Sequence, residues 1–573
     1  MKYSYILHTP NGNITIADQV NPFSAAEPQK IVMAPYTFQI SGQEKNGCCL
    51  TEITVSAEIE AEVYLSVYGE GDADLYSFAK LCEVERIFRQ SPHDPDNYHF
   101  KMEKSAVPMV AAVKDGKGEF IISDNPSYFD NATTQHIIPE QKCFYVSSGD
   151  KGGAPNYPIS DEFGPIYHKI NAGTAHTLRF VAAKATAGSL SAVRREGYRI
   201  IEKVFGTGSD SLYRAMCFAA NYMHIRINER GTSNKWIVAG IEYGNSQYVR
   251  DAFWQSWILD EEIEAESYRA LVFGEGKLGI AAEYPLVHLI WTYRLFKNGR
   301  SFDRENAKLA LQGIFECMDK YPDGGYYANS LREMGAFRNW FDMCAFEKDD
   351  LDAYNQSLLI CALEAAKRLG FEIGDRKERA IEHYHKLFNG KYFQLSDKKK
   401  YMCLDFTVGE VIHYVLFGEL FIDQKAFETT YRRIVDGPAK TPYGIKIIST
   451  EDGGLPTLDA FAAYGQVFEE VKTHEPGRYH LGGSWHLYEI LFHIAGYLHG
   501  MPDAEQNMIE RVLIDLNIGG STYEYNHTVT GEGMKANQGW NAAIYAVWEE
   551  LIARGEASPA FFEAVDAKLE SFE

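Results

Sequence analysis

The sequence feature that most constrains this chain is a change in hydrophobic period near residue 190. Before that point, short runs alternate apolar and polar residues, as in ITVSAEIEAEVYLSVYGEG. After it, apolar residues recur about every 3.6 positions, as in SDSLYRAMCFAANYMHIRINER. A period of two is typical of strands with one buried face, and a period of 3.6 is typical of helices. The sequence therefore predicts an N-terminal β domain followed by a helical domain.

Turn residues between the runs of the first part indicate antiparallel pairing. Asp115-Gly116-Lys117-Gly118 separates two alternating runs, which is typical of a β-hairpin. Pro10-Asn11-Gly12-Asn13 separates two short strands near the N-terminus in the same way. We therefore expect residues 1–190 to form an antiparallel β-sandwich.

The second part contains about twelve helical segments, counting a first helix over residues 191–208 that we expect to link the two domains. Several segments, such as SWHLYEILFHIAGYLHG, are apolar around most of their circumference. That composition is typical of an inner ring of helices covered by an outer ring. Twelve helices make six helical hairpins, so we expect residues 209–573 to form an all-α (α/α)6 toroid.

Composition and charge indicate which partners and which cellular location this chain is suited to. The net charge of −23 disfavours nucleic acid as a partner, and no apolar run approaches the roughly 20 residues that span a bilayer. The N-terminus shows no secretory signal, and the nine cysteines are odd in number and lack CxxC spacing. We therefore expect reduced thiols and a cytoplasmic location, with no membrane partner. The oligomeric state stays open.

Several common catalytic and metal-binding motifs are absent. The sequence lacks HExxH, zinc-finger spacing, an EF-hand loop, a GxSxG elbow and a phosphate-binding GxxxxGK[ST] loop. The 17 histidines are scattered without a pattern that indicates a metal site. We expect no cofactor, although a structural calcium ion stays open.

Aromatic residues are abundant, with 36 Tyr, 33 Phe and 8 Trp. Aromatic rings stack on sugars, but a large helical core accounts for this composition equally well. Glycoside hydrolysis needs two carboxyl groups, and two acids lie in aromatic loops. Asp342 lies in RNWFDMC and Glu524 in TYEYNH. Taken alone, a structural role suits Asp342 and an exposed loop position suits Glu524.

Motifs in the second part resemble those of a known group of enzymes when they are read in order. YVRDAFW at 248–254, NWFD at 339–342 and YHLGGSW at 479–485 are three of them. YEYN at 523–526, followed by TG at 530–531 and GWNAA at 539–543, completes the series. The order resembles that of the (α/α)6-barrel glucosidases, which include amylo-α-1,6-glucosidases of glycogen debranching, processing α-glucosidase I and trehalase.

The resemblance implies roles for individual residues. Asp342 matches the general acid of these enzymes and Glu524 their general base. Arg250 and Asp251 match residues that hold hydroxyl groups of the sugar being cleaved. The remaining substrate-binding candidates are Trp254, Trp340, His480, Trp485 and Trp540.

The resemblance implies an inverting exo-acting glycoside hydrolase that releases a terminal sugar, glucose, from an α-linked substrate. Two departures leave the substrate open: FEKDD at 346–350 replaces a family Gly-Lys-Pro, and His486 replaces a proline. Glu347, Asp349 and Glu532 are alternative catalytic acids. The alternative functions are an α-L-rhamnosidase or another exo-glycosidase, a disaccharide phosphorylase of the same architecture, and a noncatalytic carbohydrate-binding protein.

Overall fold

The fold is that of a computed structural model of the full chain. It describes residues 1–77, 109–123, 135–138, 141–147, 168–206, 208–222, 225–227, 235–237, 248–258, 268, 283–327, 340, 350–457, 475–519, 522–536 and 538–571. The chain divides into two compact units, residues 1–246 with 566–573, and residues 247–565. The domain boundaries expected at residues 190 and 208 stay a prediction.

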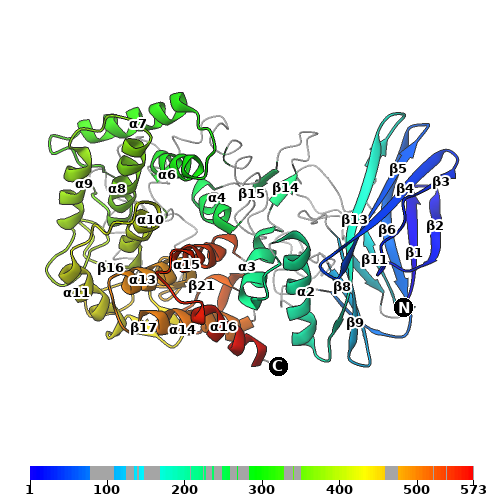
Figure 1. The fold of residues 1–573 in the computed structure, drawn as a ribbon. Coiled ribbons are helices and arrows are strands. Elements are labelled where there is room, and N and C mark those ends of the chain that lie inside the picture. The colour runs from blue at the N-terminus through cyan, green and yellow to red at the C-terminus, as the bar shows by residue number, and fades with distance from the viewer. Residues whose placement is uncertain are drawn as a thin grey trace. The chain divides into compact units, whose positions relative to one another are not determined.

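Two antiparallel sheets make up most of the first unit (Figure 1). In spatial order, the first sheet consists of β10 (Gln135–Ile138), β11 (Cys143–Ser147), β6 (Ala61–Glu70), β1 (Lys2–Thr9) and β2 (Gly12–Val20), with β12 (His168–Ile170) also paired to β6. The second sheet consists of β3 (Gln29–Met33), β4 (Tyr36–Lys45), β5 (Cys48–Ala57), β13 (Ala175–Thr186), β9 (Lys117–Ser123), β8 (Met109–Lys114) and β7 (Asp74–Ser77).

The two sheets share one hydrophobic core. Leu7 and Leu65 of the first sheet and Phe38 and Val55 of the second are fully buried members of the same cluster. Buried and less buried positions alternate along β5, because successive side chains of a strand leave opposite faces. The antiparallel β-sandwich predicted for this part of the chain is confirmed.

The predicted hairpin at Asp115-Gly116 is also confirmed. Lys114 of β8 pairs with Lys117 of β9, so that Asp115 and Gly116 alone form the turn. Both residues have positive φ, 52° and 73°. A two-residue turn of this kind matches the twist of the strands and requires positive φ at both positions, which explains the Asp-Gly pair.

This unit also contains helices α2 (Leu190–Phe205) and α3 (Leu212–Tyr222) and the small strands β14 (Ile225–Ile227) and β15 (Lys235–Ile237). Ser189 caps α2 by accepting a hydrogen bond from the backbone N–H of Ala192. The buried Glu202 pairs with Arg214 at 2.9 Å and accepts backbone hydrogen bonds from the turn that follows α2. These contacts fix the turn between the two helices.

The second unit is mainly helical (Figure 1). Its longer helices are α4 (Val249–Gln255), α6 (Glu283–Lys297), α7 (Arg304–Asp319), α8 (Ala353–Arg368), α9 (Arg376–His385), α10 (Val408–Phe417), α11 (Gln424–Val435), α13 (His486–Leu498), α14 (Ala504–Gly519) and α15 (Ala543–Ala553). The last helix, α16 (Ala560–Ser571), begins in this unit, and its residues from Asp566 onward belong to the first unit. No helix in the described ranges is long and apolar enough to cross a bilayer.

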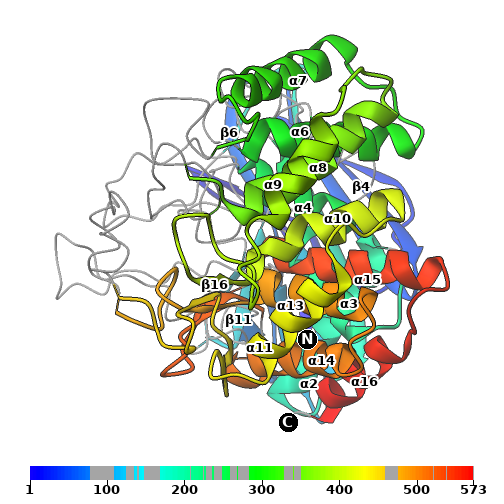
Figure 2. The same ribbon diagram turned by 90° about the vertical axis from the view of Figure 1, so that its left-hand side faces the viewer.

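Buried and amphipathic helices alternate along this unit. The buried helices α6, α8, α10 and α13 are each followed by a helix with one exposed face, namely α7, α9, α11 and α14. The buried α8 packs against α6 and α10, and α10 packs against α13 (Figure 2). Inner and outer helices therefore alternate as the sequence predicts, while closure into a complete (α/α)6 toroid stays a prediction.

The sandwich core provides a first test of the described packing. Val67 of β6 is fully buried, whereas Val32 of β3 is 65% exposed. We expect Val67→Ala to lower the free energy of unfolding of the sandwich by about 2 kcal/mol, because it removes two buried carbons and leaves a cavity. Urea unfolding followed by circular dichroism measures this change.

Val32→Ala is the matched control, since it makes the same change in an exposed strand position. Its effect should stay within about 0.5 kcal/mol. Equal effects of the two substitutions would contradict the assignment of β6 to the core.

Candidate functional site

Arg250 lies in the first turn of α4 in an almost fully buried ion pair. Its Nη1 lies 2.9 Å from Glu283 Oε1, and its Nε lies 3.6 Å from Asp251 Oδ2. Burial opposes the positive charge, but Glu283 and Asp251 outweigh it and raise the pKa of Arg250. The guanidinium group is therefore a fixed charge at the start of α4.

A C-terminal loop reaches the same place through Gln538. Its Nε2 donates to Asp251 Oδ1 at 3.1 Å, and the short helix η8 (Gly539–Ala542) packs against α4. A Cβ at Gly539 would lie 2.4 Å from the amide end of the Gln255 side chain, so a larger residue there would require the Gln255 side chain to move. The contact brings Trp540 to 5.3 Å from the Arg250 guanidinium carbon.

Trp540 belongs to a cluster of buried rings that we call the tryptophan cluster, namely Trp340, Trp485, Tyr488 and Trp540. The ring centroids of Trp340 and Tyr488 lie 3.9 Å apart in a stacked arrangement. Trp485 lies 5.1 Å from Trp340 and 6.0 Å from Trp540. The rings of His480 and Trp340 meet edge to face at 5.1 Å. Segments distant in sequence therefore converge on one aromatic surface.

Asp405 is a buried acid attached to this cluster. It lies on the short helix η6 (Leu404–Thr407), and its Oδ2 accepts a hydrogen bond from Trp340 Nε1 at 2.7 Å. Complete burial raises the pKa of Asp405 to about 6. A carboxyl group that titrates near neutral pH therefore holds one of the rings.

Glu524 lies on a small sheet that also carries Trp485. Strand β21 (Tyr523–Asn526) pairs with β20 (Ser484–Trp485) and β22 (Gly533–Ala536). Tyr525 of β21 stacks on Trp485 at 5.4 Å. Glu524 is 3% exposed and leaves the opposite face of the strand from Tyr525. Glu524 is therefore a buried acid next in sequence to Tyr525, whose ring stacks on Trp485 of the tryptophan cluster.

A buried charge network anchors this sheet. Asp515 of α14 accepts hydrogen bonds from Asn526 Nδ2 at 2.6 Å and from the backbone N–H of Tyr523 at 3.1 Å. It also pairs with Arg511 and, at 2.7 Å, with His486 Nδ1. Burial alone would raise the pKa of Asp515, but the charges of Arg511 and His486 lower it below its usual range.

The network extends from Asp515 to the other strand of the sheet. Glu489 lies 2.9 Å from Arg511 Nε and accepts a hydrogen bond from Ser484 Oγ at 2.8 Å. Asp515 thus holds β21 and Glu489 holds β20, and Arg511 joins the two acids. We call Glu489, Arg511, Asp515 and His486 the anchor network.

The structure brings together most of the described residues that the sequence singled out. Arg250, Asp251, Trp340, His480, Trp485 and Trp540 lie at or next to the tryptophan cluster. Trp254 packs instead against Phe253 and Trp257, at 5.3 and 5.9 Å.

The candidate catalytic acids differ in burial and in whether the structure describes them. Glu524 is buried, whereas Glu532 is exposed. Asp342, Glu347 and Asp349 lie outside the described residues. The spacing between Asp342 and Glu524 thus stays a prediction.

Sequence reasoning missed Glu283, Asp405, Gln538 and the anchor network. Two signals were available: Asp405 stands between Leu404 and Phe406, and Arg511 and Asp515 are spaced i, i+4 on one face of a helix. Glu283 and Gln538 offered no signal, because their roles depend on partners far away in sequence.

Within the described ranges, no metal-ligating cluster adds to the candidate site, and one cysteine, Cys403, forms a hydrogen bond with Asp405. No group of three or more His, Cys, Asp or Glu side chains in these ranges is arranged to hold a metal ion. The seven cysteines found there are buried and free. Burial raises the pKa of several of their thiols, including Cys317 and Cys361.

Among the comparisons with known proteins, only those with solved structures give matches. No protein-family model and no curated protein matches the sequence. A bacterial glucoamylase complexed with acarbose is similar in structure at 10% identity and a TM-score of 0.39, covering 99% of this chain and 90% of that one. A GH63 mannosylglycerate hydrolase from Thermus thermophilus has 12% identity and a TM-score of 0.39, covering 59% and 99%. TM-scores this low do not establish a shared fold.

Asp405 gives a prediction about pH. Folding raises the pKa of Asp405 from 3.8 to about 6, so the protonated carboxyl group contributes fully to the stability of the folded state below pH 3.8. This contribution is lost as the pH rises through about 6, where the buried group must ionise. Asp405→Asn should therefore match the wild type near pH 4. At pH 7 it should exceed the wild-type free energy of unfolding by about 3 kcal/mol. Urea unfolding at the two pH values measures the difference, and a difference independent of pH would contradict the shift.

The anchor network gives a prediction about stability. Asp515→Asn leaves a buried arginine without its nearest counter-charge, so we expect a loss of about 3–5 kcal/mol. Asp503→Asn is the matched control, because Asp503 pairs with Arg432 at 2.8 Å while both side chains are about a third exposed. That loss should stay below about 1 kcal/mol. Similar losses in urea unfolding would mean that Asp515 is not a buried anchor.

Proposed function

We propose that this chain is an inverting, exo-acting glycoside hydrolase that releases a terminal sugar, glucose, from an α-linked oligosaccharide or glycoside. One observation carries the proposal. Motif residues far apart in sequence, from Arg250 to Trp540, converge on one buried cluster of aromatic rings and charged groups. The sequence resemblance concerns the same residues.

The chemistry of the cluster suits a sugar. Aromatic faces bind the C–H faces of a pyranose ring, and fixed polar groups bind its hydroxyl groups. The Tyr488 hydroxyl and the Trp540 indole N–H are buried and have no hydrogen-bond partner in the described part of the protein. Buried polar groups are rarely left unpaired, so these two are candidates for binding a hydroxylated ligand.

In the proposed mechanism, Asp342 and Glu524 act on opposite faces of the anomeric carbon. Asp342 donates its proton to the glycosidic oxygen, and the leaving group departs as an alcohol. Glu524 removes a proton from the water that attacks the anomeric carbon, so the configuration inverts. Carboxyl groups in inverting enzymes lie about 6.5–9.5 Å apart, which leaves room for this water.

The charged groups at the start of α4 would hold the non-reducing sugar. Arg250 donates hydrogen bonds, and Asp251 accepts them from sugar hydroxyls. Glu283 fixes the Arg250 guanidinium group through the 2.9 Å contact, so the donors are oriented before substrate arrives. Preorganised groups cost little reorganisation in the transition state.

The test is proton NMR of the anomeric signal during digestion of isomaltose, trehalose, kojibiose and nigerose. We expect glucose to appear first as the β-anomer. Asp342→Asn and Glu524→Gln should each lower the rate by about 10²- to 10⁴-fold, because each removes general acid or base catalysis. Release of the α-anomer first would contradict inversion.

Glu532→Gln is the matched control, since Glu532 is an exposed glutamate that follows the same strand. If this variant loses activity while Glu524→Gln keeps it, the base is wrongly assigned. Sugar release that requires added phosphate would identify a phosphorylase. Turnover of rhamnosides alone would change the sugar, and binding without turnover of any glycoside would indicate a noncatalytic protein.

A further inference from the structure

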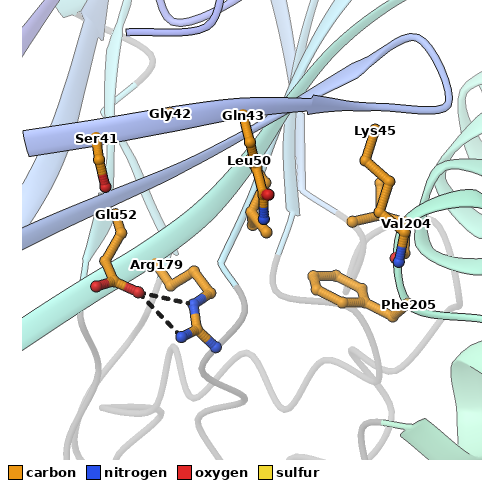
Figure 3. A pocket seen from close by; sticks show the side chains of 9 residues that line it. All are labelled: Ser41, Gly42, Gln43, Lys45, Leu50, Glu52, Arg179, Val204 and Phe205. Carbon is orange, nitrogen blue, oxygen red and sulfur yellow. Dashed lines mark hydrogen bonds and ion pairs between the residues drawn. The ribbon is translucent and has the colours of Figure 1, made fainter. Parts of the chain in front are cut away.

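The tryptophan cluster contains buried polar groups that lack a partner. They are the Tyr488 hydroxyl and the Trp540 indole N–H, which form no hydrogen bond in the described part of the protein. The cavity of about 620 Å³ on the sandwich unit differs in this respect (Figure 3). None of the nine described residues that line it has a buried polar side-chain atom without a partner. Since buried polar groups are rarely left unpaired, the cluster is the better candidate of the two for a polar ligand.

Tyr488 is a permanent hydrogen-bond donor within the cluster. It lies in the first turn of α13, and its hydroxyl group is close enough to Arg250 for the two groups to interact electrostatically. Burial raises the pKa of Tyr488 well above its ordinary value, because a phenolate would be poorly solvated there. The phenol therefore keeps its proton and can donate a hydrogen bond to a sugar hydroxyl.

The Trp340 ring supports the Tyr488 ring. The two ring centroids lie 3.9 Å apart and the ring planes differ by 27°, so Tyr488 covers one face of Trp340. Trp340 is 1% exposed, and the rings of Trp485 and His480 meet it edge to face. The covered face is unavailable to a sugar. This packing makes Trp340 a support for Tyr488, although the resemblance to glucosidases names it as a substrate-binding residue.

Asp405 sets the orientation of the Trp340 ring. The indole N–H of Trp340 donates to Asp405 Oδ2 at 2.7 Å, and both side chains are buried. Asp405 lies on η6, which packs against α13, the helix that carries Tyr488. An indole ring has a single N–H, so a short hydrogen bond to a fixed acceptor determines the rotation of the whole ring.

The backbone of η6 is itself held by two neighbouring segments. Tyr384 of α9 donates its hydroxyl to the carbonyl of Phe406 at 2.8 Å. The backbone N–H of Leu404 donates to the carbonyl of Ile447 at 3.1 Å. The acceptor of the Trp340 hydrogen bond is therefore attached to a fixed piece of backbone.

We propose that Asp405 is a positioning residue of the sugar-binding site: through Trp340 it holds the Tyr488 hydroxyl where that group donates to a hydroxyl of the substrate. The inference rests on the proposed function, because it takes the tryptophan cluster as the place where a sugar binds. It adds a residue to that function, since none of the motifs that resemble glucosidases includes Asp405. In this arrangement Asp405 neither contacts the substrate nor transfers a proton.

Titration calorimetry on the full chain tests the inference, with isomaltose, trehalose, kojibiose and nigerose as probes. The parent chain carries Glu524→Gln to slow any turnover. We expect at least one probe to bind saturably, and Tyr488→Phe to weaken that binding by about three- to tenfold, because one hydrogen bond is lost. Asp405→Leu should weaken it by a similar factor, because it keeps the branching of the side chain but removes the acceptor of the Trp340 hydrogen bond.

Two comparisons separate positioning from general damage to the fold. Asp405→Asn keeps an acceptor for the Trp340 N–H, so its affinity should return to within about threefold of that of the parent chain. In a chain that already carries Tyr488→Phe, Asp405→Leu should weaken binding by less than about twofold more, because the hydroxyl that it positions is gone. Independent losses that multiply in the double variant would contradict the inference.

Trp340→Phe removes the same hydrogen bond from the donor side, and it tests the inference if circular dichroism shows that Asp405→Leu does not fold. Glu410→Gln is the matched control. Glu410 is a buried acid on α10 that bonds His499 at 2.9 Å and backbone N–H groups, and none of its partners belongs to the tryptophan cluster. Its affinity should stay within about twofold of that of the parent chain.

The outcomes distinguish this inference from the catalytic proposal. If the wild type cleaves a probe while Asp405→Leu and Trp340→Phe bind it as tightly as the Glu410→Gln chain does, the inference is wrong and the catalytic proposal stands. If the wild type cleaves no glycoside but binding depends on Asp405 and Tyr488 as described, the inference stands and the catalytic proposal fails. If no probe binds, the inference is wrong, whatever else the chain cleaves.

Discussion

The tryptophan cluster depends on one buried interaction, the pairing of Arg511 with Asp515 and Glu489. Two acids on different helices hold two strands of one small sheet, and a single guanidinium group holds the two acids. Burying three charges is costly unless each is paired and hydrogen-bonded. Each of the three charges is paired here, and the arrangement fixes β20 and β21, which carry Trp485 and Glu524. The position of Glu524, the proposed base, is thus set by the anchor network.

Burial also determines the strength of charge interactions and the pKa values in the helical unit. Charges interact more strongly in a poorly solvated interior than in water, so fixed groups such as Arg250 and Glu283 exert a strong local field. The same burial makes ionisation of Asp405 unfavourable and places its pKa near neutrality. One helical scaffold therefore holds a permanent cation and an acid that titrates near neutral pH within a single set of ring contacts.

Local patterns in the sequence predicted local structure well. The Asp115-Gly116 turn, the alternating strands of the sandwich and the buried helices α8 and α13 each follow from rules that act over a few residues. Trp340, Trp485 and Trp540 were also predicted to share a site, but only through their resemblance to known motifs. Gln538 and Glu283 could not be predicted, since each acquires its role from a partner on a distant helix. Trp254 was predicted to share the site with Arg250, which lies one helical turn earlier. Its ring packs instead against Phe253 and Trp257.

The contact between Asp251 and Gln538 spans 287 positions of the chain. Contacts of such long range form late, because the intervening segment must first be ordered. During synthesis at about 5–20 residues per second, roughly 15–60 s separate the appearance of the two side chains. The helices between them can pack in that interval, but the cluster stays incomplete until the last part of the chain emerges. A nascent chain therefore contains most of the helices of the second unit before it can complete the tryptophan cluster, and a chain that ends before Gln538 lacks the contact with Asp251.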